Sequence, residues 1–406
     1  MSVSISDLYS DRVKAAPAPY FPRPPGPIVY DFYAGDPPPE TYPLEELKEY
    51  LVRAMDRAGI QLTQYNPTWR QDMVRGDPGL RERLAERISR RDGRDVDADW
   101  IMLAHGSSDG LALAARAFLS PGDGAIVEAA TFPYMVGYMR ATGARIATVP
   151  VDRDGMVVDA IEDRLRRLRD SGVRPKMIYV IPTFHVPTGA LMPIERREKL
   201  VALAQKWGVM VVEDNAYYEQ YFDEPPPPTL FSMDDSGLVL LSETFGKQLA
   251  PGLRLGYMTG VPEAMQALDL VREDLGVNKL IPMMLDEYIG DGKLDAHMER
   301  VRAASRQKRD AALAALQKHC EPWVEFEVPR GGIYFWLKLS DEIDPEKLTE
   351  LLNAGGIACR AGEGFSDDGS AGAGYLRMSF QQETLEGIER GVESLGRALA
   401  ASTTRP

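Results

Sequence analysis

Three near-continuous apolar runs in the middle of the chain constrain its fold more than any other feature. They occupy residues 176–182, 208–214 and 237–245, and a helical pattern or a loop separates each from the next. Strands that are buried on both faces have this composition, because neither face can carry polar side chains. The alternation with helices indicates a mostly parallel sheet in an α/β domain. Three shorter β-rich runs continue the pattern at residues 100–105, 124–130 and 145–151.

The chain changes character after about Asp286. A long charged helix is expected over 294–320, and two strands around a Pro-Gly-Gly turn are expected within 324–339. A helix, a strand and a further helix close the chain, which describes a smaller α+β unit. We therefore predict an N-terminal arm with part of the small domain at 1–60, a large domain at 61–290 and a small C-terminal domain at 291–406.

Charge and composition exclude several classes of partner. The formal net charge of −14 argues against binding to nucleic acid. Two cysteines and four scattered histidines leave no spacing typical of a protein-ligated metal. No apolar run has the length of a signal-peptide core or a membrane span. We predict a cytoplasmic protein that binds no metal, membrane or nucleic acid.

Polar residues follow three of the expected strands, at the sheet edge where α/β proteins bind ligands. Ser107 and Ser108 open a helix, and the N–H groups and hydroxyls at such a helix start suit an anion such as phosphate. Asp214 leaves a buried strand, where a carboxylate requires a cation. Lys247 follows the strand that contains Thr244, and a desolvated lysine becomes a nucleophilic amine. A helix cap, a buried salt bridge and a lysine that reaches for water are the structural alternatives.

These three features together suit one cofactor. Pyridoxal 5′-phosphate requires a phosphate cradle, a carboxylate for its pyridinium nitrogen and an amine for its aldehyde. The segment 244–256, TFGKQLAPGLRLG, is similar to the lysine signature S-x-S-K-x-x-x-P-G-x-R-x-G of the class I/II aminotransferases. From about Val29 to Leu399 the chain resembles this family of fold-type I enzymes. The resemblance implies a large domain with a mostly parallel seven-stranded sheet, a smaller α+β domain and bound pyridoxal phosphate.

The resemblance also implies roles for residues that would bind the cofactor. Lys247 would form the Schiff base and move the proton, Asp214 would pair with the ring nitrogen, and Tyr217 would bind the phenolic oxygen. Phe132 would stack on the ring, although core packing is the alternative for this residue. The phosphate would be bound by Ser107, Ser108, Thr244 and Arg254.

Substrate and subunit contacts follow from the same resemblance. Arg377 would bind the substrate α-carboxylate by bidentate pairing, and Gly35 would lie beside the substrate. Tyr65 would reach the phosphate of a neighbouring subunit, which implies a homodimer with shared active sites. A partner for a second substrate carboxylate is not evident, and Arg70, Arg75 and Arg360 are the candidates.

The chain departs from the family pattern at two places that bear on which reaction it catalyses. Where the family has P-x-F-x-N-P-T-G, this chain has PTFHVPTG, so Val186 stands in place of an asparagine that donates to the phenolic oxygen. His185 beside it could contact the substrate as an acid/base group, or it could be structural. The segment 66–75 is longer than the usual connection, and it either shapes substrate choice or is a plain surface insertion.

The resemblance is compatible with three functions. The first is transamination, in which an L-amino acid and a 2-oxo acid exchange an amino group by a ping-pong route. The second keeps the same quinonoid chemistry but diverts it to elimination, replacement, cyclisation or oxidation. A third is a non-catalytic effector-binding domain like those of bacterial regulators, which the acidic charge disfavours. Tyr33, Phe132 and Tyr134 favour an aromatic, aliphatic or long-chain substrate.

Overall fold

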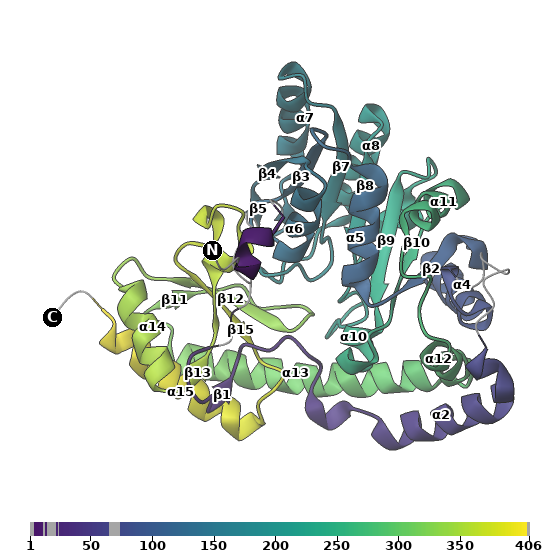
Figure 1. The fold of residues 1–406 in the computed structure, drawn as a ribbon. Helices are drawn as coiled ribbons and strands as arrows, with labels where there is room; N and C mark the ends of the chain where they lie inside the picture. Colours follow the sequence, from purple (N-terminus) through teal and green to yellow (C-terminus); the bar gives the residue numbers. More distant parts are fainter. Residues whose placement is uncertain (1–3, 11–12, 14–21, 23, 65–73, 404–406) are drawn as a thin grey trace.

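The large domain is built on a seven-stranded sheet (Figure 1). The computed structural model describes residues 4–10, 13, 22, 24–64 and 74–403. All neighbouring strands of this sheet run parallel except β10, which is antiparallel to both of its neighbours. In spatial order the strands are β2 (Ile101–Ala104), β10 (Gly256–Thr259), β9 (Val239–Thr244), β8 (Met210–Asp214), β7 (Pro175–Val180), β3 (Gly124–Glu128) and β4 (Arg145–Val149).

The apolar runs form buried strands because their side chains alternate between two hydrophobic cores. On β7, Ile178 and Val180 enter one core, while Met177 and Tyr179 enter the other. Each core is closed by helices on its own face of the sheet, so both faces are covered. The first core includes α4 (Pro78–Asp92), α8 (Ile194–Trp207) and α12 (Leu280–Gly290), and the second includes α5 (Ser107–Phe118), α6 (Pro133–Ala141) and α11 (Pro262–Val271). The smaller elements of this domain are α7 (Ile161–Asp170), α9 (Leu230–Met233), α10 (Phe245–Gln248) and the β5–β6 hairpin (Val151–Asp152 and Gly155–Met156).

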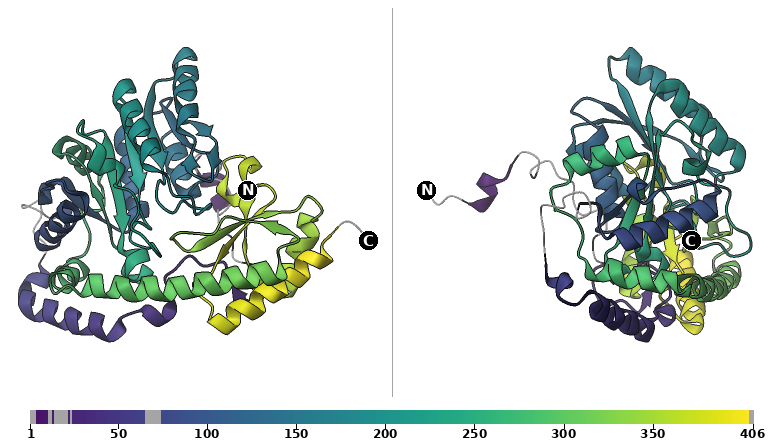
Figure 2. Two further views of the ribbon diagram at one scale, coloured as in Figure 1. Left: turned by 180° about the vertical axis from the view of Figure 1, so that it is seen from behind. Right: turned by 90° about the vertical axis from the view of Figure 1, so that its right-hand side faces the viewer.

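The second unit is a four-stranded antiparallel sheet packed against helices. Its strands are β11 (Val324–Glu325), β12 (Tyr334–Leu339), β15 (Tyr375–Ser379) and β14 (Arg360–Ala361) in spatial order. The helices are α13 (Lys293–His319), α14 (Pro345–Ala354) and α15 (Leu385–Ala401). The long helix α13 runs beneath both units in two opposite views (Figures 1 and 2).

The N-terminal segment divides between the two units. Strand β1 (Tyr30–Asp31) pairs in parallel with β13 (Ile357–Ala358) of the small domain. Helix α2 (Leu44–Ala58) instead packs on α12, where the ring centroids of Tyr50 and Tyr288 are 5.3 Å apart. Tyr50 belongs to the core of the large sheet. Residues 30–31 thus pair with the small domain, while helix α2 packs on the large domain.

The strands predicted from apolar runs are present, but one strand of the sheet was not predicted. Strand β10 follows directly after the arginine-containing turn, and its four residues include Gly256 and Thr259. Such a short run carries little periodic signal. No helix in the described part of the chain combines the length and the apolar composition that crossing a membrane requires.

Candidate active site

A cavity of about 370 Å³ lies where the carboxyl ends of β2, β8 and β9 meet the small domain and the segment 33–36. Both domains and this segment contribute to its wall, so it is complete only in the folded arrangement. The predicted residues that line it are Gly35, Ser107, Ser108, Phe132, Asp214, Tyr217, Thr244, Lys247, Arg254 and Arg377. Tyr65 and most of the segment 66–75, with Trp69 and Arg70, lie outside the described residues.

Lys247 is held by contacts from the opposite side of the cavity. It lies on α10, a single turn that begins after Thr244 caps it by accepting a hydrogen bond from the Gly246 N–H at 3.1 Å. The Lys247 amine donates to the Gly35 carbonyl and lies 3.5 Å from Asp36 Oδ1. The amine is thus directed into the cavity, in the position that condensation with an aldehyde requires.

Asp214 lines the cavity, and its carboxylate is only partly satisfied by the protein. Its Oδ2 accepts a hydrogen bond of 2.7 Å from the Tyr179 hydroxyl, while its Oδ1 is buried and unpaired in the described structure. Burial raises the pKa of Asp214 to about 6. An unsatisfied buried carboxylate oxygen is costly. A protonated ring nitrogen would satisfy it, so the site fits pyridoxal phosphate here.

The opposite end of the cavity suits a phosphate group. Helix α5 starts at Ser107 after Gly106, whose φ of +81° favours glycine. A Cβ on Gly106 would lie 3.1 Å from the Arg254 guanidinium, and a Cβ on Gly256 would lie 2.6 Å from the Ser107 nitrogen. The two glycines therefore let a helix N-terminus and a guanidinium approach each other closely. Both donate hydrogen bonds to anions, and the helix dipole adds to the attraction.

Two arginines of the small domain converge on one backbone carbonyl. Arg377 is 2% exposed and donates to the Tyr33 carbonyl oxygen, to which Arg360 Nε also donates at 3.1 Å. Arg377 Nε is buried without a partner in the described structure. Burial and the neighbouring Arg377 lower the pKa of Arg360 to about 10. This pair forms a concentrated positive site that fits a substrate carboxylate.

Of the arginines considered for a second carboxylate, Arg360 lines the cavity and Arg75 does not. Arg75 is buried elsewhere, with a hydrogen bond of 2.7 Å to Asp269. Arg70 lies outside the described residues.

Tyr334 also lines the cavity, and the sequence did not identify it. Its hydroxyl is 3.2 Å from the Tyr217 hydroxyl. From the sequence, the surrounding segment indicates only a hairpin of the small domain. The available signal was a tyrosine two residues after the Gly-Gly turn, where a polar end can enter the cleft between the domains.

The cavity walls beside the expected ring position are apolar. Phe132 is half-buried, and its ring centroid is 5.4 Å from that of Tyr134. Val186 lines the cavity and is 7% exposed. The wall at position 186 therefore offers no hydrogen-bond donor.

The suggestion that His185 contacts the substrate is not supported by its position. The side chain is fully buried and does not line the cavity. Its Nδ1 is 2.9 Å from Thr188 Oγ1, and its Nε2 is 3.4 Å from Glu128 Oε1. The apolar residues on both sides place His185 in the core beneath the strand ends, which is the structural alternative.

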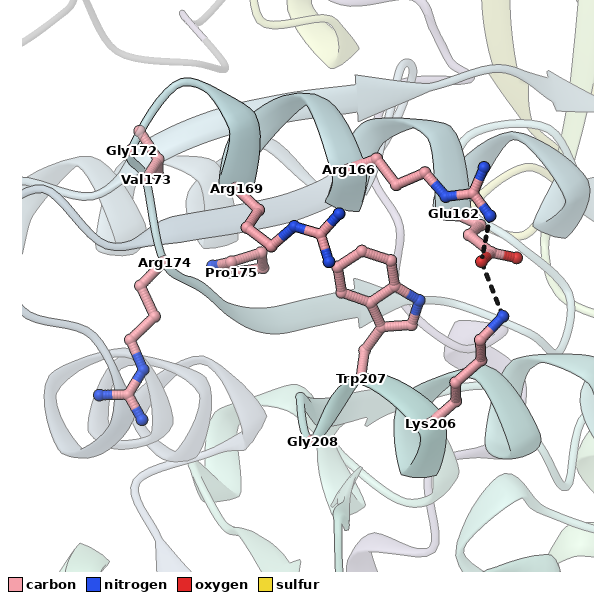
Figure 3. A pocket seen from close by; sticks show the side chains of 10 residues that line it. All are labelled: Glu162, Arg166, Arg169, Gly172, Val173, Arg174, Pro175, Lys206, Trp207 and Gly208. Atoms are coloured by element: carbon pink, nitrogen blue, oxygen red, sulfur yellow. Dashed lines mark hydrogen bonds and ion pairs between the residues drawn. The ribbon is translucent and has the colours of Figure 1, made fainter.

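A separate hollow of about 840 Å³ lies on the large domain, where β7 begins (Figure 3). The Arg169 guanidinium covers the Trp207 ring at 5.0 Å, and Glu162 accepts hydrogen bonds from Arg166 and Lys206. Glu162 thus pairs with two of the cations, and the hollow lies at the amino end of the strands. Ligands in such sheets bind at the carboxyl end. Within the described residues there is no cluster of side chains that could hold a metal ion.

Comparison with known proteins agrees with this geometry. The family model for aminotransferase class I and II matches residues 41–395. The aromatic-amino-acid aminotransferase 1 of Thermococcus litoralis is 31% identical, over 91% of this chain and 88% of its own length. The 2-aminoadipate transaminase of Thermus thermophilus is 34% identical, over 92% of this chain and 90% of its own length. The Pyrococcus horikoshii kynurenine aminotransferase, solved in complex with PMP, superposes with a TM-score of 0.90 at 29% identity and covers 98% of both chains. This chain therefore belongs to the class I and II aminotransferases, the pyridoxal-phosphate enzymes of fold type I.

Proposed function

We propose that this enzyme exchanges an amino group between an L-amino acid and a 2-oxo acid, in two half-reactions at the cavity described above. The observation that carries the proposal is the arrangement of Lys247, Asp214 and Arg377 around one cavity. Bound pyridoxal phosphate supplies an aldehyde and an electron-accepting ring. The protein supplies the binding groups and the proton transfers.

Each of these residues has a task that its environment supports. Asp214 keeps the ring nitrogen protonated, because its free Oδ1 is buried and attracts a cation. Arg377 binds the α-carboxylate through its guanidinium and thereby orients the substrate Cα. Lys247 then removes a proton at Cα and returns it at the cofactor carbon, since the amine is already directed into the cavity.

For the substrate we propose an aromatic or long-chain L-amino acid. Tyr33, Phe132 and Phe365 line the cavity, and Arg360 adds a second positive charge near Arg377. Relatives of this chain are named for aromatic amino acids, 2-aminoadipate and kynurenine. These substrates combine an α-carboxylate with a long or aromatic side chain, which suits these residues.

We further propose a cytoplasmic homodimer. Apolar side chains are exposed around α2 and the segment 274–283, with Leu44 71% exposed and Ile60 70% exposed. A groove of about 850 Å³ in this region is lined by Met55, Leu62, Leu275 and Met283 among others. An exposed apolar groove of this kind marks an interaction site. Sedimentation equilibrium should give a mass close to twice 45.0 kDa, and a monomer at micromolar concentration would contradict this proposal.

The alternative is a diverted reaction at the same cofactor. It is favoured by Val186, which lines the cavity and puts an apolar side chain where the family signature has an asparagine. Elimination, replacement, cyclisation or oxidation would then replace the return of the amino group.

One experiment separates the two reactions. Holoenzyme is mixed with a panel of amino acids, with and without oxygen, and the cofactor and products are analysed. Stoichiometric conversion to pyridoxamine phosphate that a 2-oxo acid reverses supports transamination. Release of ammonia, peroxide or a cyclic product without that conversion supports the alternative and contradicts transamination.

A further inference from the structure

The Tyr334 side chain forms part of the cavity wall and is almost completely buried. Its hydroxyl lies 3.2 Å from the Tyr217 hydroxyl, and the two rings meet edge to face at 78° with centroids 6.0 Å apart. A Cβ placed on Gly35 would be 2.0 Å from this oxygen. Tyr334 is only 5% exposed. The hydroxyl is therefore confined between Tyr217 and the backbone of Gly35, and its hydrogen-bonding direction is restricted.

The charges around the two phenols differ. The Arg377 guanidinium lies 4.0 Å from the centre of the Tyr334 ring. Burial raises the pKa of the Tyr334 phenol, but Arg377, Lys247, the hydrogen bond with Tyr217 and Arg360 together lower the pKa below its ordinary value. Burial and the adjacent phenol raise the pKa of Tyr217 well above its ordinary value. The charged and titratable groups that face this pair are Lys247, Arg360, Arg377 and Asp214.

Either hydroxyl could be the donor in this contact. Each hydroxyl carries one hydrogen. When Tyr217 gives its hydrogen to the phenolic oxygen of the cofactor, in the role that the family resemblance implies for it, the contact requires Tyr334 to donate to the Tyr217 oxygen. The donation also polarises the Tyr217 O–H bond and makes it a stronger donor in turn.

The wall at position 186 increases the importance of this contact. Val186 lines the same cavity and has no hydrogen-bond donor. An anionic oxygen bound beside Tyr217 would therefore depend on the Tyr217 hydroxyl, and the strength of that donor would depend on Tyr334.

We propose that Tyr334 is a positioning residue that, through its hydrogen bond to Tyr217, strengthens the hold of Tyr217 on the phenolic oxygen of pyridoxal phosphate. This inference rests on the proposed function and on the contact with the cofactor's phenolic oxygen that the family resemblance implies for Tyr217. Through Tyr334, the small domain helps to stabilise the ionised phenolic oxygen of the cofactor. The apolar side chain of Val186 cannot donate a hydrogen bond to that oxygen.

The test is a spectrophotometric pH titration of the holoenzyme, in which the visible absorbance of the bound cofactor is followed without substrate. Tyr334→Phe removes only the hydroxyl. The ionised phenolic oxygen then loses stabilisation, so the apparent pKa of the absorbance change should rise, by about 0.5 to 1 unit. Tyr375→Phe is the matched control, because Tyr375 lies on the strand next to β12 but stacks on Trp336 outside the cavity. This control should titrate like the wild type.

A double-mutant cycle distinguishes positioning from a general structural effect. Tyr217→Phe should raise the apparent pKa by itself. Adding Tyr334→Phe to that variant should cause no further shift, because Tyr334 acts through Tyr217. An unchanged or lowered apparent pKa in Tyr334→Phe, or a full additional shift in the double variant, would overturn the proposal.

Failure of this inference can be told apart from failure of the proposed function. The titration uses no substrate and reports only on the bound cofactor. A shift in Tyr334→Phe together with no amino-group transfer would leave the inference intact and reject transamination. Transamination by an enzyme whose Tyr334→Phe variant titrates like the wild type would do the reverse.

Discussion

Arg360 and Arg377 lie directly opposite each other on the antiparallel strands β14 and β15, and both guanidiniums donate to the Tyr33 carbonyl oxygen. Two like charges in such positions repel each other. A bound carboxylate would relieve this repulsion.

Replacing each of these arginines should therefore weaken substrate binding to a different extent. Arg377→Ala removes a bidentate partner for the α-carboxylate and should raise the KM for the amino acid about 100-fold, from two charge-assisted hydrogen bonds of about 1.5 kcal/mol each. Arg360→Gln should raise it by about 10-fold, because it removes one such bond. Steady-state kinetics with saturating 2-oxo acid measures both, and Arg390→Gln on the exposed face of α15 is the control. Unchanged KM values would remove the pair from substrate binding.

Lys247→Ala should abolish the covalent link to the cofactor. The amine is the one directed into the cavity beside Gly35, so no other lysine among the described cavity residues can replace it. Turnover should fall by several orders of magnitude. Borohydride reduction followed by mass spectrometry of peptides detects the link in the wild type and in the control Lys347→Ala, which alters an exposed lysine of α14. Detection of a reduced adduct on the protein of Lys247→Ala would show that another residue carries the cofactor.

Asp214 should make the stability of the apoenzyme depend on pH. Its pKa is raised by burial from 3.8 to about 6, so the folded state binds a proton more tightly than the unfolded state. The free energy of unfolding therefore falls as the pH rises through this interval. Asp214→Asn remains neutral, so its stability relative to the wild type should increase by about 2 kcal/mol between about pH 4 and pH 8.

Urea unfolding of the apoenzyme at both pH values measures this difference. Asp235→Asn changes an exposed carboxylate and serves as the control. An equal offset of Asp214→Asn from the wild type at both pH values would contradict the raised pKa.

Gly35→Ala should disturb the contact with Tyr334. The new methyl group would lie 2.0 Å from the Tyr334 oxygen and 3.2 Å from Cζ, so the ring must move. Overpacking of this kind destabilises by about 1 to 3 kcal/mol. Tyr334→Phe should recover part of that loss, since it removes the closest atom.

Chemical denaturation of the single and double variants measures the recovery. Gly252→Ala is the matched control, because no atom lies within 4 Å of its added methyl group. Additive losses for Gly35→Ala and Tyr334→Phe would show that the two residues do not meet in solution.

The fold was largely predictable because its signals are local. The apolar runs at β7, β8 and β9 identify buried strands without reference to the rest of the chain. Strand β10 was missed because four residues carry too little pattern. The position of His185 after a strand suggested a contact with the substrate, but the structure does not place this side chain in the cavity. Its burial against Glu128 results from contacts between distant segments, which leave no local pattern in the sequence.

The sequence by itself determined which groups follow each strand, and thereby the lysine Lys247, the carboxylate Asp214 and the helix start at Ser107. These groups are set by short stretches of backbone whose conformation depends on near neighbours. Only the tertiary structure decided that Tyr334, Arg360 and the carbonyl of Tyr33 meet them, because these residues belong to other segments. The Tyr217–Tyr334 contact joins residues 117 positions apart, and the Arg377–Tyr33 contact joins residues 344 positions apart. Such meetings result from the packing of whole domains, and no local pattern encodes them.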